Sequence, residues 1–382
     1  MDRRDFVKLG SVLAAAAAPI TAFAGNKPMA KSNHPKGFVK LSWDGLSLTT
    51  QEYTSLLMRL ADEGKIKADY YSNGGVVEEL EHKFAKLLGK ESAVFMPTGT
   101  LANQLAARQL AGTSKRVIVQ EQSHFYNDTG DSAQNLSSLN LIPLGKDKVE
   151  FTLDEVKRVV EMTRSGRVKT RVGVISIETP VRRKLDRIST YSNLKKISDY
   201  ARGEDIKMHL DGARLFVQSA HTGNSPVKYG ELFDTVYTSM WKCFNAASGA
   251  ILAGTNEFSK DLFHVRRMFG GGLPFAWPFA AVALHYADGF IDEYKKAYAN
   301  AERVFETITK DERFKIERFE NGTHIFKLTV IHPDLNRFSA KLTEKNIQLP
   351  NPQKDGFLIK INPSFNRETP DYIAQSFLES IN

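Results

Sequence analysis

Short apolar runs alternate with helix-like segments through the first two thirds of the chain. In one such segment, residues 76–89, the apolar positions recur at helical spacing and the pattern ends on a glycine, a common helix terminus. Short strands that alternate with helices are typical of a mostly parallel sheet covered on both faces, so the pattern predicts an α/β fold. Strands are expected in six runs, which span residues 92–96, 116–120, 171–178, 206–211, 234–240 and 249–254.

The last part of the chain has a different pattern, which predicts a smaller α+β domain. A long helical stretch from about residue 280 to 309 precedes two alternating, strand-like runs at 324–330 and 356–362, and residues 369–380 resemble a final helix. The predicted boundaries are 37–67 for an N-terminal segment that contributes to the small domain, 68–290 for the large domain and 291–382 for the small C-terminal domain.

The N-terminus has the pattern of an export signal. Arg3 and Arg4 form a twin-arginine pair, residues 9–20 are apolar, and residues 22–24 read Ala-Phe-Ala, a small-x-small cleavage site. Residues 1–24 therefore predict a twin-arginine signal peptide and residues 25–36 a linker, which implies a periplasmic protein exported in its folded state. The alternative is an alanine-rich tail. No later apolar stretch reaches the ~18 residues of a membrane span, so no membrane partner is expected for the mature chain.

Composition and charge narrow the possible functions further. The chain has 382 residues with 42% hydrophobic and 25% charged positions, an ordinary globular composition. Its formal net charge is +8, but the chain lacks long basic runs and any known nucleic-acid module, so a nucleic acid is not expected as a partner. The single cysteine, Cys243, excludes an internal disulfide and a CxxC metal or redox site.

Candidate chemistry lies where predicted strands end, which is where open α/β sheets bind ligands. Thr98, Gly99 and Thr100, in "PTGTLAN", stand between a strand and a helix. Free N–H groups at the helix start, a glycine and two hydroxyls can hold a phosphate, although helix capping alone also explains them. His124 follows the next strand and can stack on a planar cofactor or transfer a proton, or it can be an ordinary buried or surface histidine.

Two further stretches carry charged groups in apolar surroundings. In "MHLDGARLF", Asp211 ends a buried run and Arg214 follows three residues later. The two side chains either pair with each other or bind a ligand between them, because buried charges need partners. In "TSMWKCF", Lys242 lies among apolar and aromatic residues. Burial lowers the pKa of a lysine and gives the neutral amine that attacks a carbonyl to form a Schiff base, although a lysine whose head reaches water is the alternative.

Together these groups match the protein side of a pyridoxal 5'-phosphate site. That cofactor needs a lysine for its Schiff base, an acid that keeps its ring nitrogen protonated, and a phosphate anchor. The sequence also resembles the threonine aldolase / aromatic amino acid β-eliminating lyase family of fold-type-I enzymes that depend on pyridoxal phosphate. The similar motifs are "LEHKFAKLLGKESAVFMPTGTLANQLA", "EQSHFYND", "HLDGARLF" and "RRMFGGG".

The resemblance implies a fold with a large, mostly parallel α/β domain and a smaller α+β domain, and roles for the candidate residues. The expected activity is retro-aldol cleavage of a β-hydroxy-α-amino acid to glycine and an aldehyde, in a homodimer or homotetramer and without a metal. The implied roles are Lys242 as the Schiff-base lysine, Asp211 on the ring nitrogen, His124 over the ring face and as a base, Thr98, Gly99 and Thr100 on the phosphate, Arg214 near the phenolic oxygen and Glu178 beside the site.

Several positions depart from the family pattern on the substrate side. The usual Ser-Lys-Gly is replaced by Trp241-Lys242-Cys243, and Pro274 stands where an arginine is usual. Lys360, the best match for a carboxylate-binding arginine, and Ser42 are the candidate substrate-binding residues. The alternatives are therefore another pyridoxal phosphate-dependent lyase, racemase or transaminase, or a protein that binds the cofactor or an amino acid with little turnover.

Overall fold

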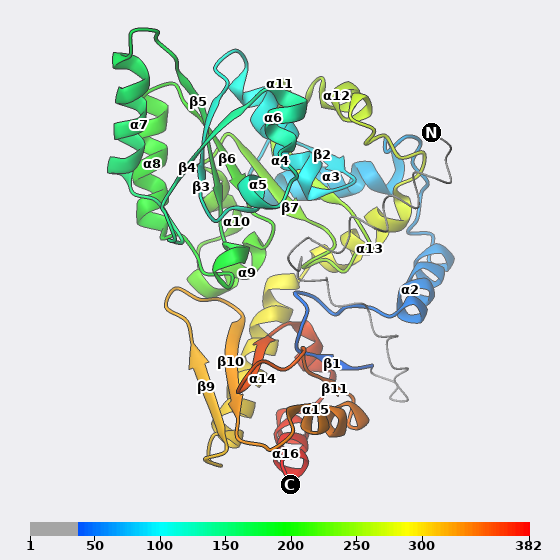
Figure 1. Cartoon of the computed structure of the whole chain (residues 1–382). Coiled ribbons are helices and arrows are strands. Elements are labelled where there is room, and N and C mark those ends of the chain that lie inside the picture. The colour runs from blue at the N-terminus through cyan, green and yellow to red at the C-terminus, as the bar shows by residue number, and fades with distance from the viewer. Residues whose placement is uncertain (1–36) are drawn as a thin grey trace, which may run out of the picture. The chain divides into compact units, whose positions relative to one another are not determined.

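A seven-stranded sheet forms the centre of the larger part of the molecule (Figure 1). The computed structural model describes residues 37–382, so the predicted signal peptide (1–24) and linker (25–36) lie outside the described residues. Strand β8 runs antiparallel to both of its neighbours, and the other paired strands are parallel. Across the sheet the order is β2 (Ser92–Met96), β8 (Ala250–Gly254), β7 (Thr235–Ser239), β6 (Lys207–Asp211), β5 (Val172–Glu178), β3 (Arg116–Gln120) and β4 (Asn140–Leu144).

Both faces of this sheet are covered by helices, because successive side chains of a strand point to opposite faces. Ile118 and Ile175 belong to the apolar cluster on the side of α3 and α8, whereas Val117 and Val174 pack with α4 on the other side. The helices of this part are α2 (Thr50–Asp62), α3 (Gly75–Leu88), α4 (Gly99–Ala111), α5 (His124–Asn127), α6 (Ser132–Ser137), α7 (Leu153–Ser165), α8 (Tyr191–Gly203), α9 (Leu215–Thr222), α10 (Pro226–Gly230), α11 (Asn256–Ser259), α12 (Leu262–Met268) and α13 (Trp277–Ala287).

The predicted α/β architecture is confirmed, with one correction. All six predicted strands form, and α3 ends on Gly89, which has a left-handed φ of 64°. The expected continuous helix over residues 280–309 is wrong, because it divides into α13 and α14 (Phe290–Ile308). Asp288 is extended and Gly289 has a φ of 77°, so the chain leaves the helical conformation between them.

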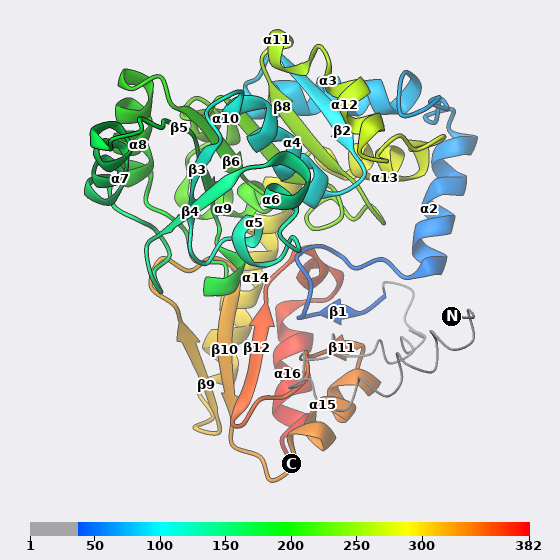
Figure 2. The same ribbon diagram turned by 45° about the horizontal axis from the view of Figure 1, so that its top comes forward.

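The C-terminal part contains a three-stranded antiparallel sheet beside α14 and α16 (Figure 2). The N-terminal strand β1 pairs in parallel with β11, so the chain just after residue 36 joins the C-terminal sequence. A second apolar cluster, separate from those of the large sheet, forms the core here. The elements are β1 (Val39–Lys40), β9 (Phe314–Arg318), β10 (Ile325–Val330), α15 (Leu335–Glu344), β11 (Ile347–Gln348), β12 (Gly356–Lys360) and α16 (Pro370–Ser380).

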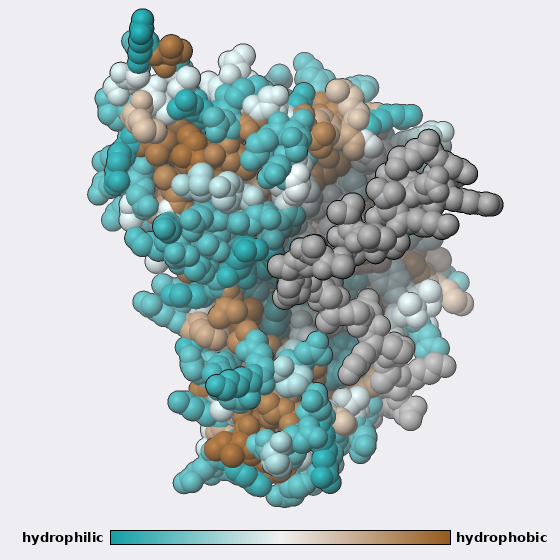
Figure 3. Space-filling model, in the orientation of Figure 1, coloured by the Kyte–Doolittle hydropathy of each residue, from teal (hydrophilic) through white to brown (hydrophobic). Residues whose placement is uncertain are grey.

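The surface carries no extended apolar belt on the face that Figure 3 shows, where apolar residues form patches between polar ones. Among the helices of residues 37–382, none combines the length and the apolar character needed to cross a membrane.

Candidate active site

Three candidate residues meet at one edge of the large sheet. Glu178 ends β5 and Asp211 ends β6, and the two residues are register partners in these parallel strands. His124 begins α5, shortly after β3 ends, and its backbone N–H donates to Glu178 Oε2 at 2.5 Å. Because the carboxyl ends of parallel strands share one edge, residues far apart in sequence become neighbours there.

Asp211 is a buried carboxylate that is held by neutral donors. Its Oδ2 accepts a hydrogen bond from Asn103 Nδ2 at 2.6 Å, and its Oδ1 accepts one from the Ala213 N–H at 3.2 Å. Among residues 37–382 no Lys, Arg or His forms an ion pair with Asp211. The alternative in which Asp211 and Arg214 pair with each other is therefore wrong.

Behind Asp211, a chain of buried polar groups fixes its orientation. Asn103 lies on α4 and also contacts His209 Nε2 at 2.9 Å, and His209 Nδ1 lies 2.9 Å from the Thr235 hydroxyl. Burial lowers the pKa of His209 to about 4, so its ring is neutral at pH 7. A fully connected buried network of this kind holds its members in one geometry.

Glu178 is buried beside Asp211. Burial, together with the negative charge of Asp211, raises the pKa of Glu178 to about 8. Its two oxygens accept hydrogen bonds from the backbone N–H groups of His124 and, at 2.8 Å, Arg182. Glu178 therefore joins the loops that follow β3 and β5.

His124 has a half-buried ring next to an acid. Its Nδ1 lies 3.5 Å from Asp128 Oδ2, one helical turn further along α5. Arg182 and Arg183 also bind the Asp128 carboxylate. The carboxylate favours a proton on Nδ1, which leaves Nε2 of a neutral ring as the acceptor.

At the start of α4, Thr98 caps the helix and Gly99 packs closely against a neighbouring side chain. Thr98 is the N-cap residue, and its hydroxyl accepts from the Leu101 N–H at 3.2 Å, so its side chain caps the helix. Gly99 and Thr100 begin the first turn, whose N–H groups lack intrahelical partners. A Cβ on Gly99 would overlap the hydroxyl of Tyr237, a buried residue of β7. Only glycine fits this position.

Lys242 lies in the turn between β7 and β8. Its Nζ is 4.7 Å from the centroid of the Trp241 ring. Burial, with a smaller effect of the positive charge of Arg214, lowers the pKa of Lys242 to about 8. A sizeable fraction of this amine is therefore neutral near pH 8.

Arg214 belongs to a cluster of five ionisable side chains that come from separate segments of the chain. Its guanidinium contacts Asp44 at 2.9 Å and Asp186 at 3.4 Å. Lys360, at the end of β12, contacts Asp44 at 2.7 Å and Asp186 at 3.5 Å, and His324 Nε2 lies 2.9 Å from Asp44. Asp44, Asp186 and His324 lie close enough together to offer three metal ligands, but the two cations already balance the two carboxylates.

Both substrate-binding candidates, Lys360 and Ser42, belong to this cluster or lie close to it in the sequence. Lys360, whose side chain is 21% exposed, already binds two carboxylates. Ser42 lies in the turn after β1, two residues before Asp44. Sequence reasoning missed five residues of this region, because each lies in a segment without a recognised motif or in the interior of an element: Asp44, Asn103, Asp186, Tyr237 and His324.

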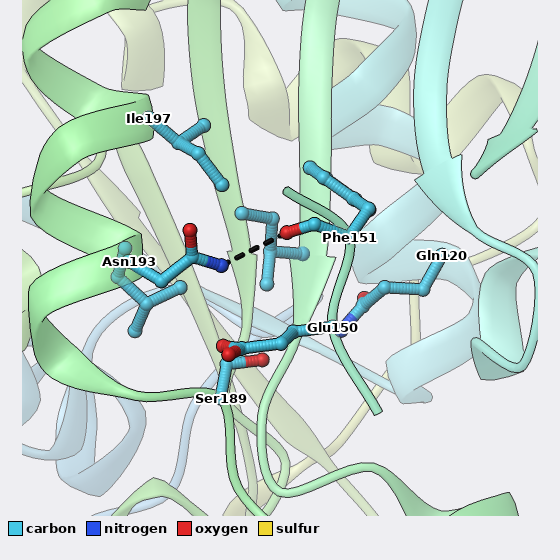
Figure 4. A pocket seen from close by; sticks show the side chains of 8 residues that line it. Gln120, Glu150, Phe151, Ser189, Asn193 and Ile197 are labelled. Atoms are coloured by element: carbon cyan, nitrogen blue, oxygen red, sulfur yellow. Dashed lines mark hydrogen bonds between the residues drawn. The ribbon is translucent and has the colours of Figure 1, made fainter. Parts of the chain in front are cut away.

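A small pocket lies elsewhere, between α8 and the sheet (Figure 4). Asn193 Nδ2 donates to the Phe151 carbonyl at 2.9 Å beside it. None of the candidate active-site residues lines this pocket. One lining residue, Gln120, contacts the site: its Nε2 donates to the Glu178 carbonyl at 2.8 Å, and its Oε1 accepts from the Glu178 N–H at 2.6 Å.

The fold is that of the fold-type-I enzymes that depend on pyridoxal phosphate. A serine palmitoyltransferase of Sphingomonas wittichii superposes with a TM-score of 0.64 at 15% identity, over 99% of this chain and 97% of the other. A Listeria monocytogenes protein that is proposed to be an L-allo-threonine aldolase superposes with a TM-score of 0.73 at 26% identity, over 91% and 96% of the two chains.

The chain belongs to the beta-eliminating lyase family, whose model matches residues 50–330. A low-specificity L-threonine aldolase of Candida albicans is 25% identical over 331 residues, which cover 84% of this chain and 86% of the relative. The corresponding enzyme of Escherichia coli K12 is 25% identical over 61% of this chain and 69% of its own length. The resemblance recognised in the sequence is thus confirmed.

Proposed function

We propose that this protein is a pyridoxal phosphate-dependent lyase that cleaves a β-hydroxy-α-amino acid to glycine and an aldehyde. Membership of the beta-eliminating lyase family and the similarity to low-specificity L-threonine aldolases support this activity. We also keep export to the periplasm as a prediction from residues 1–24, which predict a signal peptide.

One observation carries the proposal: Asp211 is a buried carboxylate that pairs with no cation of residues 37–382. An unpaired buried charge is costly, and the protonated ring nitrogen of pyridoxal phosphate would supply the missing cation. Lys242, whose amine is shifted toward its neutral form, is the group that would hold the cofactor's aldehyde carbon. The residues present therefore fit this cofactor.

Two further features suit the remainder of the cofactor. The backbone N–H groups of Gly99 and Thr100, at the start of a 13-residue helix, would bind the phosphate, and the helix dipole favours negative charge there. The half-buried ring of His124, held by its contact with Asp128, would lie over the cofactor ring. We infer these roles from the geometry together with the family resemblance.

The chemistry then divides between cofactor and protein. When bound, pyridoxal phosphate supplies a cationic ring that accepts the electron pair released at the substrate's α-carbon. Asn103 and the Ala213 N–H fix the position of Asp211, whose negative charge would keep the ring nitrogen protonated. His124 accepts the β-hydroxyl proton at Nε2, directly or through water. Lys360 would bind the substrate's carboxylate and Arg214 would lie near the cofactor's phenolic oxygen, and Asp44 and Asp186 pair with both cations.

The direct test is product formation by the purified protein with pyridoxal phosphate. L-Threonine, L-allo-threonine and 3-phenylserine should release glycine together with acetaldehyde or benzaldehyde, measured by chromatography and by an alcohol dehydrogenase coupled assay. A visible absorption band that borohydride bleaches should accompany activity. Bound cofactor without glycine from any of these substrates would overturn the proposed reaction, and transfer of the amino group to a keto acid would favour a transaminase instead.

The lowered pKa of Lys242 predicts how its reactivity depends on pH. Because the pKa is about 8, we expect the rate of adduct formation with added pyridoxal phosphate to rise between about pH 7 and 9 and then level off. Cyanoborohydride trapping followed by peptide mass spectrometry would measure this rate at Lys242. A rate that keeps climbing to pH 10.5 would contradict the predicted shift.

A further inference from the structure

Two tryptophans with half-exposed rings stand beside Lys242. Trp43 is 43% exposed and Trp241 is 44% exposed, which is unusual for such large apolar side chains. Their ring centroids are 6.5 Å apart in an edge-to-face arrangement, with an interplanar angle of 77°. The Lys242 amine is 4.7 Å from the Trp241 ring centroid, so this aromatic pair adjoins the candidate amine.

The loop that carries Trp43 packs directly onto the loop that carries Lys242. A Cβ on Gly45 would lie only 2.6 Å from the Lys242 carbonyl oxygen, and the Leu46 N–H donates to Asn245 Oδ1 at 2.7 Å. The two loops are therefore in contact, although about 200 residues separate them in the sequence. The position of Trp43 next to the site is set by backbone packing.

The backbone around Trp43 is held by contacts with other segments, whereas the two indole rings can still contact a ligand. The Trp43 carbonyl accepts from Asn362 Nδ2 at 2.9 Å, and the next residue, Asp44, is fixed by Arg214, Lys360 and His324. Neither indole N–H forms a hydrogen bond with another residue of the described chain. The Lys242 amine lies over the Trp241 ring, but both tryptophans remain about half exposed. A fixed backbone that presents exposed aromatic surface is a preorganised site for a planar apolar group.

We propose that Trp43 and Trp241 bind the side chain of the substrate, and that this enzyme prefers β-hydroxy-α-amino acids with an aromatic group on the β-carbon. The proposal rests on the proposed lyase function. A phenyl ring is large enough to contact the exposed surface of both indole rings, whereas the methyl group of threonine contacts only a small part of it, so the aromatic substrate gains more from burial. The same surface would leave a short polar side chain without hydrogen-bond partners.

The test compares kcat/KM for 3-phenylserine and for threonine in the enzyme with its cofactor. We expect the wild-type ratio to favour phenylserine by at least about tenfold. Trp43→Ala and Trp241→Ala should each lower this ratio at least about fivefold. Met162→Ala, which truncates another exposed apolar side chain on α7, should leave the ratio unchanged. A wild-type ratio of one or less, or a ratio that neither tryptophan substitution changes, would overturn the proposal while leaving the lyase function intact.

A second measurement does not depend on turnover. Trp43 and Trp241 are two of the three tryptophans, so intrinsic fluorescence can follow binding of L-phenylalanine and L-alanine, which lack the β-hydroxyl. L-Phenylalanine should bind at least about tenfold more tightly than L-alanine, and Trp43→Ala should remove that difference. This result would support the aromatic site even if no substrate released glycine, which would refute only the proposed reaction.

A second copy of the chain could also cover Trp43 and Trp241, as part of a subunit contact. Size-exclusion chromatography with light scattering tests this alternative. The molar masses of Trp43→Ala and Trp241→Ala should equal that of the wild type. A smaller assembly in either variant would assign the aromatic pair to a subunit contact and would overturn the proposal.

Discussion

Replacement of Lys242 by alanine is expected to lower kcat/KM for amino-acid cleavage by at least about 10³-fold, equivalent to about 4 kcal/mol of transition-state stabilisation. Lys242 is the half-buried amine of the site, and desolvation lowers its pKa to about 8. Alanine has no amine with which to hold the cofactor's aldehyde carbon. Measuring glycine release from a β-hydroxy amino acid over several hours makes a decrease in rate of about 10³-fold detectable.

The matched control for this variant is Lys260→Ala, which removes an exposed lysine after α11. That substitution should keep wild-type turnover and the visible absorption band. Circular dichroism should give the same spectrum for all three proteins, since removal of an unpaired amine leaves the apolar core intact. Near-normal turnover by a folded Lys242→Ala protein would refute the assignment of Lys242.

Replacement of Asp44 by asparagine is expected to lower the free energy of unfolding by about 3–5 kcal/mol. The Asp44 carboxylate is buried and binds Arg214 and Lys360 at 2.9 and 2.7 Å. Asparagine leaves these two cations with only Asp186 to neutralise them. Urea unfolding at pH 7 measures the difference. Asp355→Asn, which breaks an exposed ion pair with Lys327, should change the unfolding midpoint far less.

The same residue predicts a pH dependence. Burial by itself would raise the pKa of Asp44, but the charges of Arg214 and Lys360 and the hydrogen bond from His324 outweigh it and hold that pKa well below its ordinary value. The folded state therefore binds this proton less readily than the unfolded state, whose pKa is about 3.9. Stabilisation by Asp44 is complete above about pH 5 and falls as the pH drops further.

The wild type should consequently lose stability below about pH 4 more steeply than Asp44→Asn does. Thermal melts at pH 3, 4, 5 and 7 would compare the two proteins. Parallel curves for both, or a loss of stability in the Asn variant smaller than that of Asp355→Asn, would contradict the role of Asp44 in the cluster.

Some elements of the fold follow from local patterns. The run at β3 forms a strand at the predicted residues, because a buried parallel strand needs a continuous apolar segment of limited length. The break between α13 and α14 was not predicted, since the apolar pattern continues through it and the helix is interrupted only by the extended backbone of Asp288 and the left-handed backbone of Gly289. Periodicity detects which face is buried and is insensitive to one residue of unusual φ.

Site residues that lie at the ends of strands could be predicted from the sequence to be neighbours. Asp211 and Glu178 come directly after apolar runs, and parallel strands bring such positions together. The partners of Asp44 could not be predicted from the sequence. Asp44 and His324 are 280 residues apart, and Asp44 and Lys360 are 316 apart, so no local pattern relates them.

The sequence by itself therefore determined the α/β architecture, the family and the residues that end the strands, because these depend on local periodicity and on short contiguous motifs. Only the tertiary structure decided that Asp211 pairs with neutral donors, that Arg214 and Lys360 share Asp44 and Asp186, and that Trp43 stands beside Trp241. Most of these contacts join segments that are far apart in the sequence, and their geometry exists only when the sheet, the N-terminal turn and the C-terminal strands have packed together.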